Sequence, residues 1–217
     1  MLDVFNIAKP QNCDIQTFYG SAYVAATTGA STWVKPRGVS NIYMLLIGSG
    51  GAGNGSFGGA CGSVTVWYGS ANNVPDVLYV NPSAQGTGYA TTVSIRNNSS
   101  SGAFINLLVA NSPTGISSAG TSAANQFAAS GFYQNINGVG GSGGDPGAST
   151  TTFLQPGGVG TNTANYGYVT SGSGFFQMQP IFVSAGAVGA GRGGVGSGGG
   201  STNNSLGGNG LVLIASW

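Results

Sequence analysis

The residues that could carry chemistry in this chain are few, and the commonest catalytic types are missing. The sequence contains no histidine and no glutamate. Histidine is the usual general base and a frequent zinc ligand, so a Ser-His-Asp triad and most zinc sites are excluded. The carboxylates are four scattered aspartates: Asp3, Asp14, Asp76 and Asp145. Glycoside cleavage would need two of them as a pair, and we therefore expect no enzyme activity, no bound metal and no cofactor.

One motif with a chemical use does occur. Residues 48–53, Gly-Ser-Gly-Gly-Ala-Gly, follow an apolar segment and match G-x-G-x-x-G, the dinucleotide-binding fingerprint. That use requires a helix directly afterwards, because the pyrophosphate binds at the N-terminus of the helix. Residues 54–59 are rich in glycine and contain asparagine, which disfavours a helix. Asp76 stands near the place of the ribose-binding acid, but it is better explained as a turn residue. We interpret the motif as glycine-rich structure.

Aromatic residues supply the one candidate binding site. Six of them lie among glycine-rich blocks: Phe132, Tyr133, Tyr166, Tyr168, Phe175 and Phe176. Aromatic side chains held on loops stack on sugars and form the energetic centres of protein interfaces. We therefore treat these six as candidate receptor-binding residues. The alternative is that they fill the core beneath a glycine layer, or a subunit interface.

The elements that would position these side chains are β-strands. Apolar, β-branched and aromatic segments recur at short intervals between turn residues, which is typical of an all-β fold. The expected strands cover residues 42–47, 63–68, 77–81, 91–96, 103–110 and 210–216. Residues 32–34 give a further strand signal before a turn at 36–38. We predict an all-β protein with a β-sandwich or jelly-roll-like core and extended glycine-rich segments.

The chain divides into an arm and one domain. Residues 1–30 are mixed and polar, and we expect an N-terminal arm that docks on a neighbouring subunit. Residues 31–217 are expected to form a single glycine-rich β domain. The best helix candidate is residues 119–129, and the beginning of the chain lacks the charge and apolar pattern of a signal peptide.

Glycine accounts for 42 of the 217 residues, and its spacing carries information. Gly138, Gly141, Gly144 and Gly147 are three residues apart, as are Gly193, Gly196 and Gly199. Three residues per turn is the period of the extended polyproline-type helix, which has no internal hydrogen bonds. We predict that the blocks 138–147 and 186–200 are ordered, extended and bonded to neighbouring backbone. The alternative is a set of flexible linkers.

The charge balance limits the partners. Charged residues make up 4% of the chain and the net charge is +1, so nothing steers nucleic acid or an anionic membrane. The longest apolar run, residues 42–47, is too short to span a bilayer. A surface with so little charge favours association, so we expect a homotrimer or another symmetric assembly. Cys13 and Cys61 could form one disulfide or remain two buried thiols, and we favour the thiols.

The order of segments carries a family resemblance. Residues 33–39, Trp-Val-Lys-Pro-Arg-Gly-Val, form a turn that precedes an apolar strand and the glycine run 48–62. Strand-like segments at 64–68 and 78–88 follow, then a threonine-bearing segment at 91–93, and the glycine run 207–210 leads into an apolar strand ending in Trp217. This order resembles the glycine-rich domains of bacteriophage virion proteins, especially tail-fibre and spike tips. The match covers residues 31–110 and 186–217, and the glycine blocks here are leaner than in such domains.

The resemblance implies a place in the virion and a binding function. We expect a structural protein of the virion surface, a spike or tail-tip subunit that attaches the particle to its host without catalysis. Its partners would be other virion proteins and a glycan or protein of the host surface, with no nucleic acid and no membrane insertion. The alternative is a capsid-building or cementing protein that touches no receptor. A glycan-cleaving enzyme is disfavoured by the aspartate count, and an ice-binding protein is a further alternative that flat glycine arrays allow.

Overall fold

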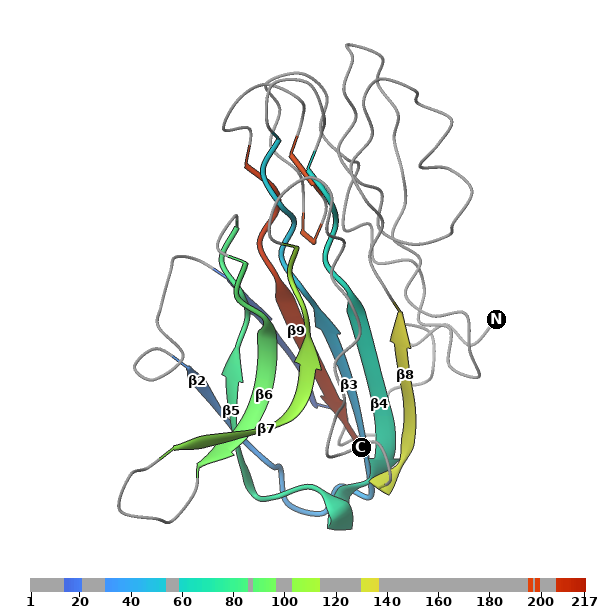
Figure 1. Cartoon of the computed structure of the whole chain (residues 1–217). Helices are drawn as coiled ribbons and strands as arrows, with labels where there is room; N and C mark the ends of the chain where they lie inside the picture. Colours follow the sequence, from blue (N-terminus) through green and yellow to red (C-terminus); the bar gives the residue numbers. More distant parts are fainter. Residues whose placement is uncertain are drawn as a thin grey trace.

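Two antiparallel sheets make up the protein in the computed structural model (Figure 1). The structure describes residues 14–20, 30–53, 59–85, 88–96, 103–113, 130–136, 195–196, 198–199 and 206–217. The five-stranded sheet has the order β1 (Asp14–Tyr19), β9 (Leu211–Ser216), β3 (Asn41–Ile47), β4 (Val64–Ser70) and β8 (Phe132–Ile136). The four-stranded sheet has the order β2 (Ser31–Val34), β5 (Val77–Asn81), β6 (Thr91–Arg96) and β7 (Phe104–Ala110). The 3-10 turn η1 (Ala71–Asn73) connects β4 to β5.

The predicted all-β fold is confirmed, and the six strands expected from the sequence are present as β3, β4, β5, β6, β7 and β9. The signal over residues 32–34 corresponds to β2, and the chain turns at residues 37–38 as expected. Gly38 has a φ of 81°, a left-handed conformation that glycine adopts without a steric penalty. The helix candidate at residues 119–129 lies outside the described residues. In the described part of the chain, no helix is long and apolar enough to cross a membrane.

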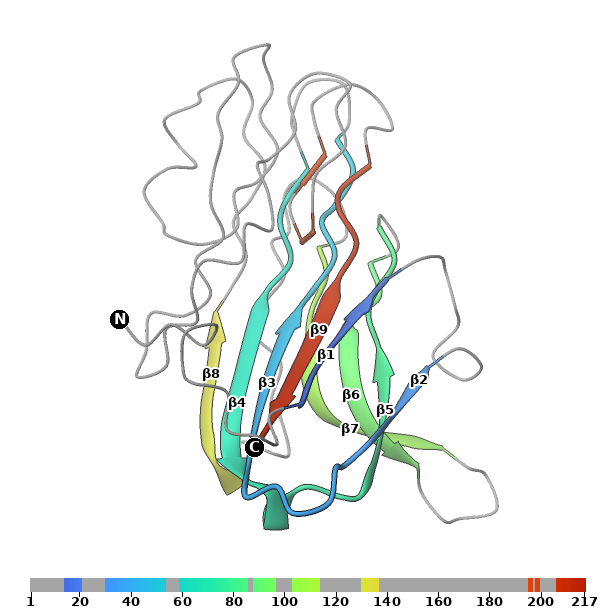
Figure 2. The ribbon, with the colours of Figure 1, turned by 180° about the vertical axis from the view of Figure 1, so that it is seen from behind.

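Two strands were not expected. β1 belongs to the segment predicted to be an arm docking on a neighbour, yet it pairs with β9 of its own chain along its whole length. Figure 2 shows β1 at the edge of the sheet, beside β9. β8 pairs with β4 at the opposite edge of the same sheet. The boundary proposed at residue 30 stays a prediction, because residues 21–29 lie outside the described part.

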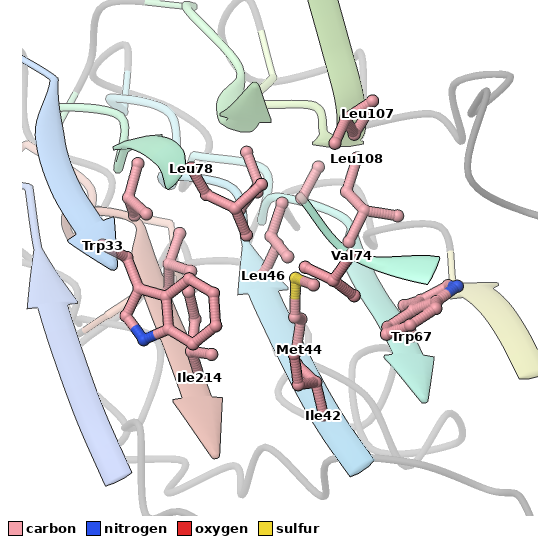
Figure 3. Close-up of a cluster of buried hydrophobic side chains, with 14 of the residues drawn as sticks. Trp33, Ile42, Met44, Leu46, Trp67, Val74, Leu78, Leu107, Leu108 and Ile214 are labelled. Carbon is pink, nitrogen blue, oxygen red and sulfur yellow. The ribbon is translucent and has the colours of Figure 1, made fainter. Parts of the chain in front are cut away.

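The main core lies between the two sheets. Strand β3 is buried on both faces, as its continuous apolar sequence predicts, and Met44 and Leu46 point toward the four-stranded sheet. Across the interface, Trp33 of β2 and Leu78 of β5 are fully buried against them (Figure 3). The mixture of residues from both sheets in one buried cluster identifies the architecture as a sandwich.

A second buried cluster covers the other face of the five-stranded sheet. It consists of Tyr43, Leu45, Ile47, Val64, Val66, Leu211, Leu213 and Ala215. Ile15, Tyr68, Val195 and Trp217 pack against it and are partly buried. The central strands β3, β4 and β9 are therefore apolar on both faces, which explains their continuous hydrophobic sequences.

Beyond the upper ends of β3, β4 and β9 in Figure 1, the chain continues in extended glycine-rich segments. We call them the glycine bundle. It consists of residues 48–53, 59–63, 195–196, 198–199 and 206–210. The spacing of three reappears in their hydrogen bonds. The amides of Gly48 and Gly51 donate to the carbonyls of Ser63 and Ala60, with N···O distances of 2.9 and 2.8 Å. Donors and acceptors are each three residues apart, as expected for neighbouring polyproline-type helices.

The same repeat joins the second segment of the glycine bundle to the third. The amides of Gly59 and Gly62 donate to the carbonyls of Gly199 and Gly196, at 2.8 and 3.0 Å. The third segment closes the bundle, because Gly199 donates to Gly51 of the first segment at 3.0 Å. The described part of the predicted block 186–200 is thus bonded through its backbone as predicted, but it is not extended throughout, because residues 195–196 form a turn in which Gly196 has a φ of 72°. The predicted block 138–147 lies outside the described residues.

Four buried hydroxyl groups join the glycine bundle to the four-stranded sheet. Thr91 Oγ1 donates to the carbonyl of Ile47 at 2.8 Å, so the Ser83 hydroxyl must be the donor in its 2.8 Å contact with Thr91. Ser112 in turn donates to Ser83 at 3.1 Å, and Ser49 donates to Ser112 at 2.9 Å. The result is a hydroxyl relay with one direction, Ser49 to Ser112 to Ser83 to Thr91. Aligned chains of this kind polarise and strengthen one another in a buried setting.

Candidate binding site

The sequence-predicted site residues are only partly described by the structure. Phe132 and Tyr133 are the first two residues of β8, while Tyr166, Tyr168, Phe175 and Phe176 lie outside the described residues. Because successive residues of a strand point to opposite faces, Phe132 and Tyr133 cannot share one surface. Tyr133 is half-buried and packs against the main core, whereas the side chain of Phe132 is 39% exposed. The two predicted neighbours are therefore separated, and Phe132 alone lies at the surface.

This separation predicts different effects of the two alanine substitutions on stability. Tyr133→Ala should lower the free energy of unfolding by about 2 kcal/mol, because it removes an aromatic ring that packs on the core. Phe132→Ala should lower it by less than about 1 kcal/mol, because that ring already contacts solvent. Urea denaturation of the two variants measures the difference. Equal losses would contradict the assignment of the two rings to opposite faces.

Phe132 belongs to a row of aromatic residues that crosses the outer face of the five-stranded sheet. Strand register places Phe132 opposite Tyr68 of β4, and Tyr68 opposite Tyr43 of β3. Directly opposed residues of antiparallel strands point to the same face. Tyr68 also stacks on Trp217, which follows β9, with the ring centroids 5.8 Å apart and the ring planes 22° apart. The sheet thus gathers four aromatic rings at one place.

Polar contacts fix this group at the end of the sheet farthest from the glycine bundle (Figure 1). The hydroxyl of Tyr68 donates to Asn41 Oδ1 at 3.2 Å. The backbones of Asn41 and Trp217 bond in both directions, at 2.8 and 3.1 Å, and the amide of Ser40 also donates to the Trp217 carbonyl at 2.7 Å. We call Asn41, Tyr68, Phe132 and Trp217 the aromatic patch. Its four members are partly or well exposed and uncharged.

Tyr43 stands beside Tyr68 on the same face of the sheet and differs from the members of the aromatic patch in burial. Its side chain is 4% exposed, and its hydroxyl has no hydrogen-bond partner within the described residues. Burial raises the pKa of Tyr43 well above its ordinary value, because the phenolate would lose its hydration. The hydroxyl therefore stays neutral at physiological pH, and Tyr43 contributes to the buried cluster on this face of the sheet.

The backbone amides of the dinucleotide-like motif at residues 48–53 form hydrogen bonds within the protein itself. Its amides at Gly48, Gly50 and Gly51 donate to carbonyls of the glycine bundle. The amide of Ser49 donates to the hydroxyls of Ser83 and Ser112, so these four amides are not available to a pyrophosphate, while the residues directly after the motif, 54–58, lie outside the described part. Among the described residues, no group of three histidine, cysteine or acidic side chains could hold a metal. Cys61 is buried in the bundle, and Cys13 lies outside the described part.

Sequence reasoning missed three members of the aromatic patch. Tyr68 and Trp217 each stand at the end of a predicted strand, and Asn41 stands at the beginning of one. Nothing in the sequence says that β4 and β9 both lie next to β3, so nothing brought the two rings together. One sequence feature could have indicated them: Tyr68 and Trp217 each stand at the C-terminal end of a strand that is apolar on both faces.

Chemically, the aromatic patch can bind but offers no catalytic group. The side chains of its members supply ring faces, an amide, an indole N–H and a phenolic hydroxyl, and none of them is a carboxylate, an imidazole, a thiol or an amine. Charges lie elsewhere in the described residues, for example in the ion pair of Lys35 and Asp76 at 2.9 Å. No protein-family model matches the sequence, and a search of curated proteins finds no significant match.

Proposed function

We propose that the protein is a structural protein of a bacteriophage virion surface, a spike or tail-tip subunit that attaches the particle to its host by binding alone. The observation that carries the binding role is the aromatic patch, a set of partly exposed rings held on a rigid sheet. Exposed tyrosine, tryptophan and phenylalanine side chains are typical of binding sites, since they offer large area at low entropic cost. The virion location rests on the resemblance of the segment order to glycine-rich virion domains.

Rigidity supports this proposal. Only five charged residues lie in the described part of the chain, so ion pairs contribute little to the stability of the scaffold. Apolar packing on both faces of one sheet and backbone hydrogen bonds in the glycine bundle hold it together. A preorganised surface loses little conformational entropy when a ligand binds. Several copies in a homotrimer or another symmetric assembly would multiply a weak affinity, so that particles attach firmly although each contact is modest.

A direct test uses the purified full-length chain as a competitor. If the protein is the attachment subunit, preincubation of host cells with it should slow particle adsorption by about tenfold at saturation, because the same receptors are occupied. Particles carrying Phe132→Ala should assemble at normal yield and adsorb more slowly. Gold-labelled antibodies should mark an exposed apex of the virion. Unchanged adsorption in both assays would contradict an attachment role.

The capsid-building or cementing alternative is favoured by a different surface. On the outer face of the four-stranded sheet, Val34 is 61% exposed and Val77 is 40% exposed, and the two are opposed on β2 and β5. Nearby, Tyr79 and Phe104 make an edge-to-face contact with centroids 5.2 Å apart. An exposed apolar area of this kind suits a contact with another subunit. Val34→Thr should lower particle yield if this face is a seam, and it should leave yield unchanged if it is not.

A further inference from the structure

We propose that the aromatic patch is a binding site for a neutral saccharide. The inference rests on the proposed attachment function, and it names the class of ligand that this site would take. Three properties of the patch support the assignment: the arrangement of its rings, its unused hydrogen-bond donors and the lack of charge on its side chains.

The rings have the geometry that a sugar needs. Tyr68 and Trp217 are stacked with an angle of 22° between their planes and 5.8 Å between centroids, so the rings are offset and neither covers the other completely. Phe132 lies opposite Tyr68 on the neighbouring strand and is 39% exposed. The C–H groups on one face of a pyranose ring pack well on such aromatic faces, which carry a negative partial charge.

Hydrogen-bond donors stand beside the rings. The amide nitrogen of Asn41 and the indole N–H of Trp217 make no hydrogen bond within the described residues, and neither atom is fully buried. The Asn41 amide is nevertheless oriented, because its oxygen accepts a hydrogen bond from the Tyr68 hydroxyl. Sugar hydroxyl groups are acceptors for donors of both kinds. A few fixed polar groups at the margin of an apolar surface are typical of small-ligand sites.

The charge of the patch selects the class of saccharide. Sialic acids, uronic acids and phosphorylated sugars are usually bound through arginine or lysine, because charge-assisted bonds are the strong ones. None of the four side chains of the patch is charged. Arg37 lies in the exposed turn before β3, and Lys35 is occupied by Asp76 and by the carbonyls of Ala71 and Val74. We therefore assign neutral hexoses and N-acetylhexosamines.

The tryptophans provide a direct readout. The chain has three tryptophans, of which Trp33 is 1% exposed and Trp67 is 0% exposed, whereas Trp217 is partly exposed. Acrylamide should therefore quench mainly the emission of Trp217 in the folded full-length protein. A bound saccharide covers that ring, so neutral oligosaccharides from an array of hexose and N-acetylhexosamine glycans should shift the emission and protect it from quenching.

Variants separate the patch from the rest of the surface. Trp217→Ala should weaken binding of the best array glycan by about tenfold or more in calorimetric titration, because the stacking face is lost. Trp217→Phe keeps a ring and loses the indole N–H, so it should weaken binding less and should fold normally. Tyr79→Ala, which removes a ring from an aromatic pair on the other sheet, is the matched control and should leave binding unchanged. Arg37→Ala should also leave it unchanged.

The outcomes separate this inference from the attachment function. Binding of a neutral glycan that is lost in Trp217→Ala and retained in Tyr79→Ala supports the inference. If no neutral glycan binds while the purified protein still blocks adsorption, attachment stands and the saccharide site is wrong. The saccharide site is equally wrong if only anionic glycans bind, or if Arg37→Ala abolishes binding. If neither the glycans nor the competition assay gives a signal, both proposals fail.

Discussion

Gly62→Ala is expected to lower the free energy of unfolding by about 3 kcal/mol or more, although it adds only one methyl group. Gly62 lies in the glycine bundle, where its amide donates to Gly196. A Cβ atom at this position would come within 3.0 Å of three backbone atoms of Gly48. Backbone atoms cannot rotate away as a side chain can, so the first two segments of the bundle would have to separate. Their hydrogen bonds would lengthen together, which explains the large expected loss.

The matched control is Gly38→Ala, where glycine is needed for its backbone conformation and not for lack of space. Gly38 has a φ of 81°, and a Cβ atom there would meet nothing within 4 Å. The expected loss is about 1 kcal/mol, which is the penalty of the left-handed conformation for alanine. Urea denaturation of both variants, with circular dichroism as the probe, measures the contrast. If Gly62→Ala were no worse than Gly38→Ala, the close packing of the glycine bundle would be wrong.

The strands were predictable because their pattern is local. β3 and β9 are continuous apolar runs, and β4 is rich in β-branched and aromatic residues, so each can be recognised without knowledge of its neighbours. The glycine spacing of three was equally local, and it reappears as the spacing of hydrogen bonds between Gly59 and Gly199 and between Gly62 and Gly196. Local patterns therefore predicted the class of the fold and the spacing of the hydrogen bonds in the bundle, but not the turn at residues 195–196.

The parts that escaped prediction depend on pairing between distant segments. β1 has the polar sequence DIQTFY and becomes a strand because β9 presents an edge to it, almost two hundred residues later in the chain. β8 follows a segment without strand signals and is defined by its pairing with β4. Strand propensity depends strongly on such context, so a short polar strand at a sheet edge leaves little trace in its own residues.

The candidate site shows the same limit. The aromatic residues of the glycine-rich region drew attention because they were conspicuous among small residues, and of these Phe132 alone reaches the described outer surface next to other rings. Tyr68 and Trp217 were unremarkable as ends of strands, and their stacking depends on the order of β4, β3 and β9 in the sheet. A binding surface that crosses a sheet can be predicted only after the strand order is known.

The hydroxyl relay at the base of the glycine bundle carries the second large expected effect. Thr91 Oγ1 is its terminal member and takes part in three hydrogen bonds: it accepts from the Ser83 amide at 3.0 Å and from the Ser83 hydroxyl at 2.8 Å, and it donates to Ile47 at 2.8 Å. Thr91 is fully buried and Ser83 is 4% exposed, so water cannot replace a missing partner. The relay is therefore sensitive to the loss of a single oxygen atom.

Thr91→Val keeps the shape of the side chain and removes that oxygen, so we expect it to lower the free energy of unfolding by about 3 kcal/mol or more. The amide and the hydroxyl of Ser83 would each remain buried without their acceptor, at about 1–3 kcal/mol for each group, and the Ile47 carbonyl would lose one of its donors. Thr92→Val is the matched control, because the Thr92 hydroxyl makes no hydrogen bond in the described structure and valine suits a strand. Its effect should stay within about 0.5 kcal/mol.

In hydrogen exchange, the amide of Ser49, which donates to Ser83 and Ser112, should lose protection in Thr91→Val alone. Equal stability of the two variants would show that the relay does not join the glycine bundle to the sandwich.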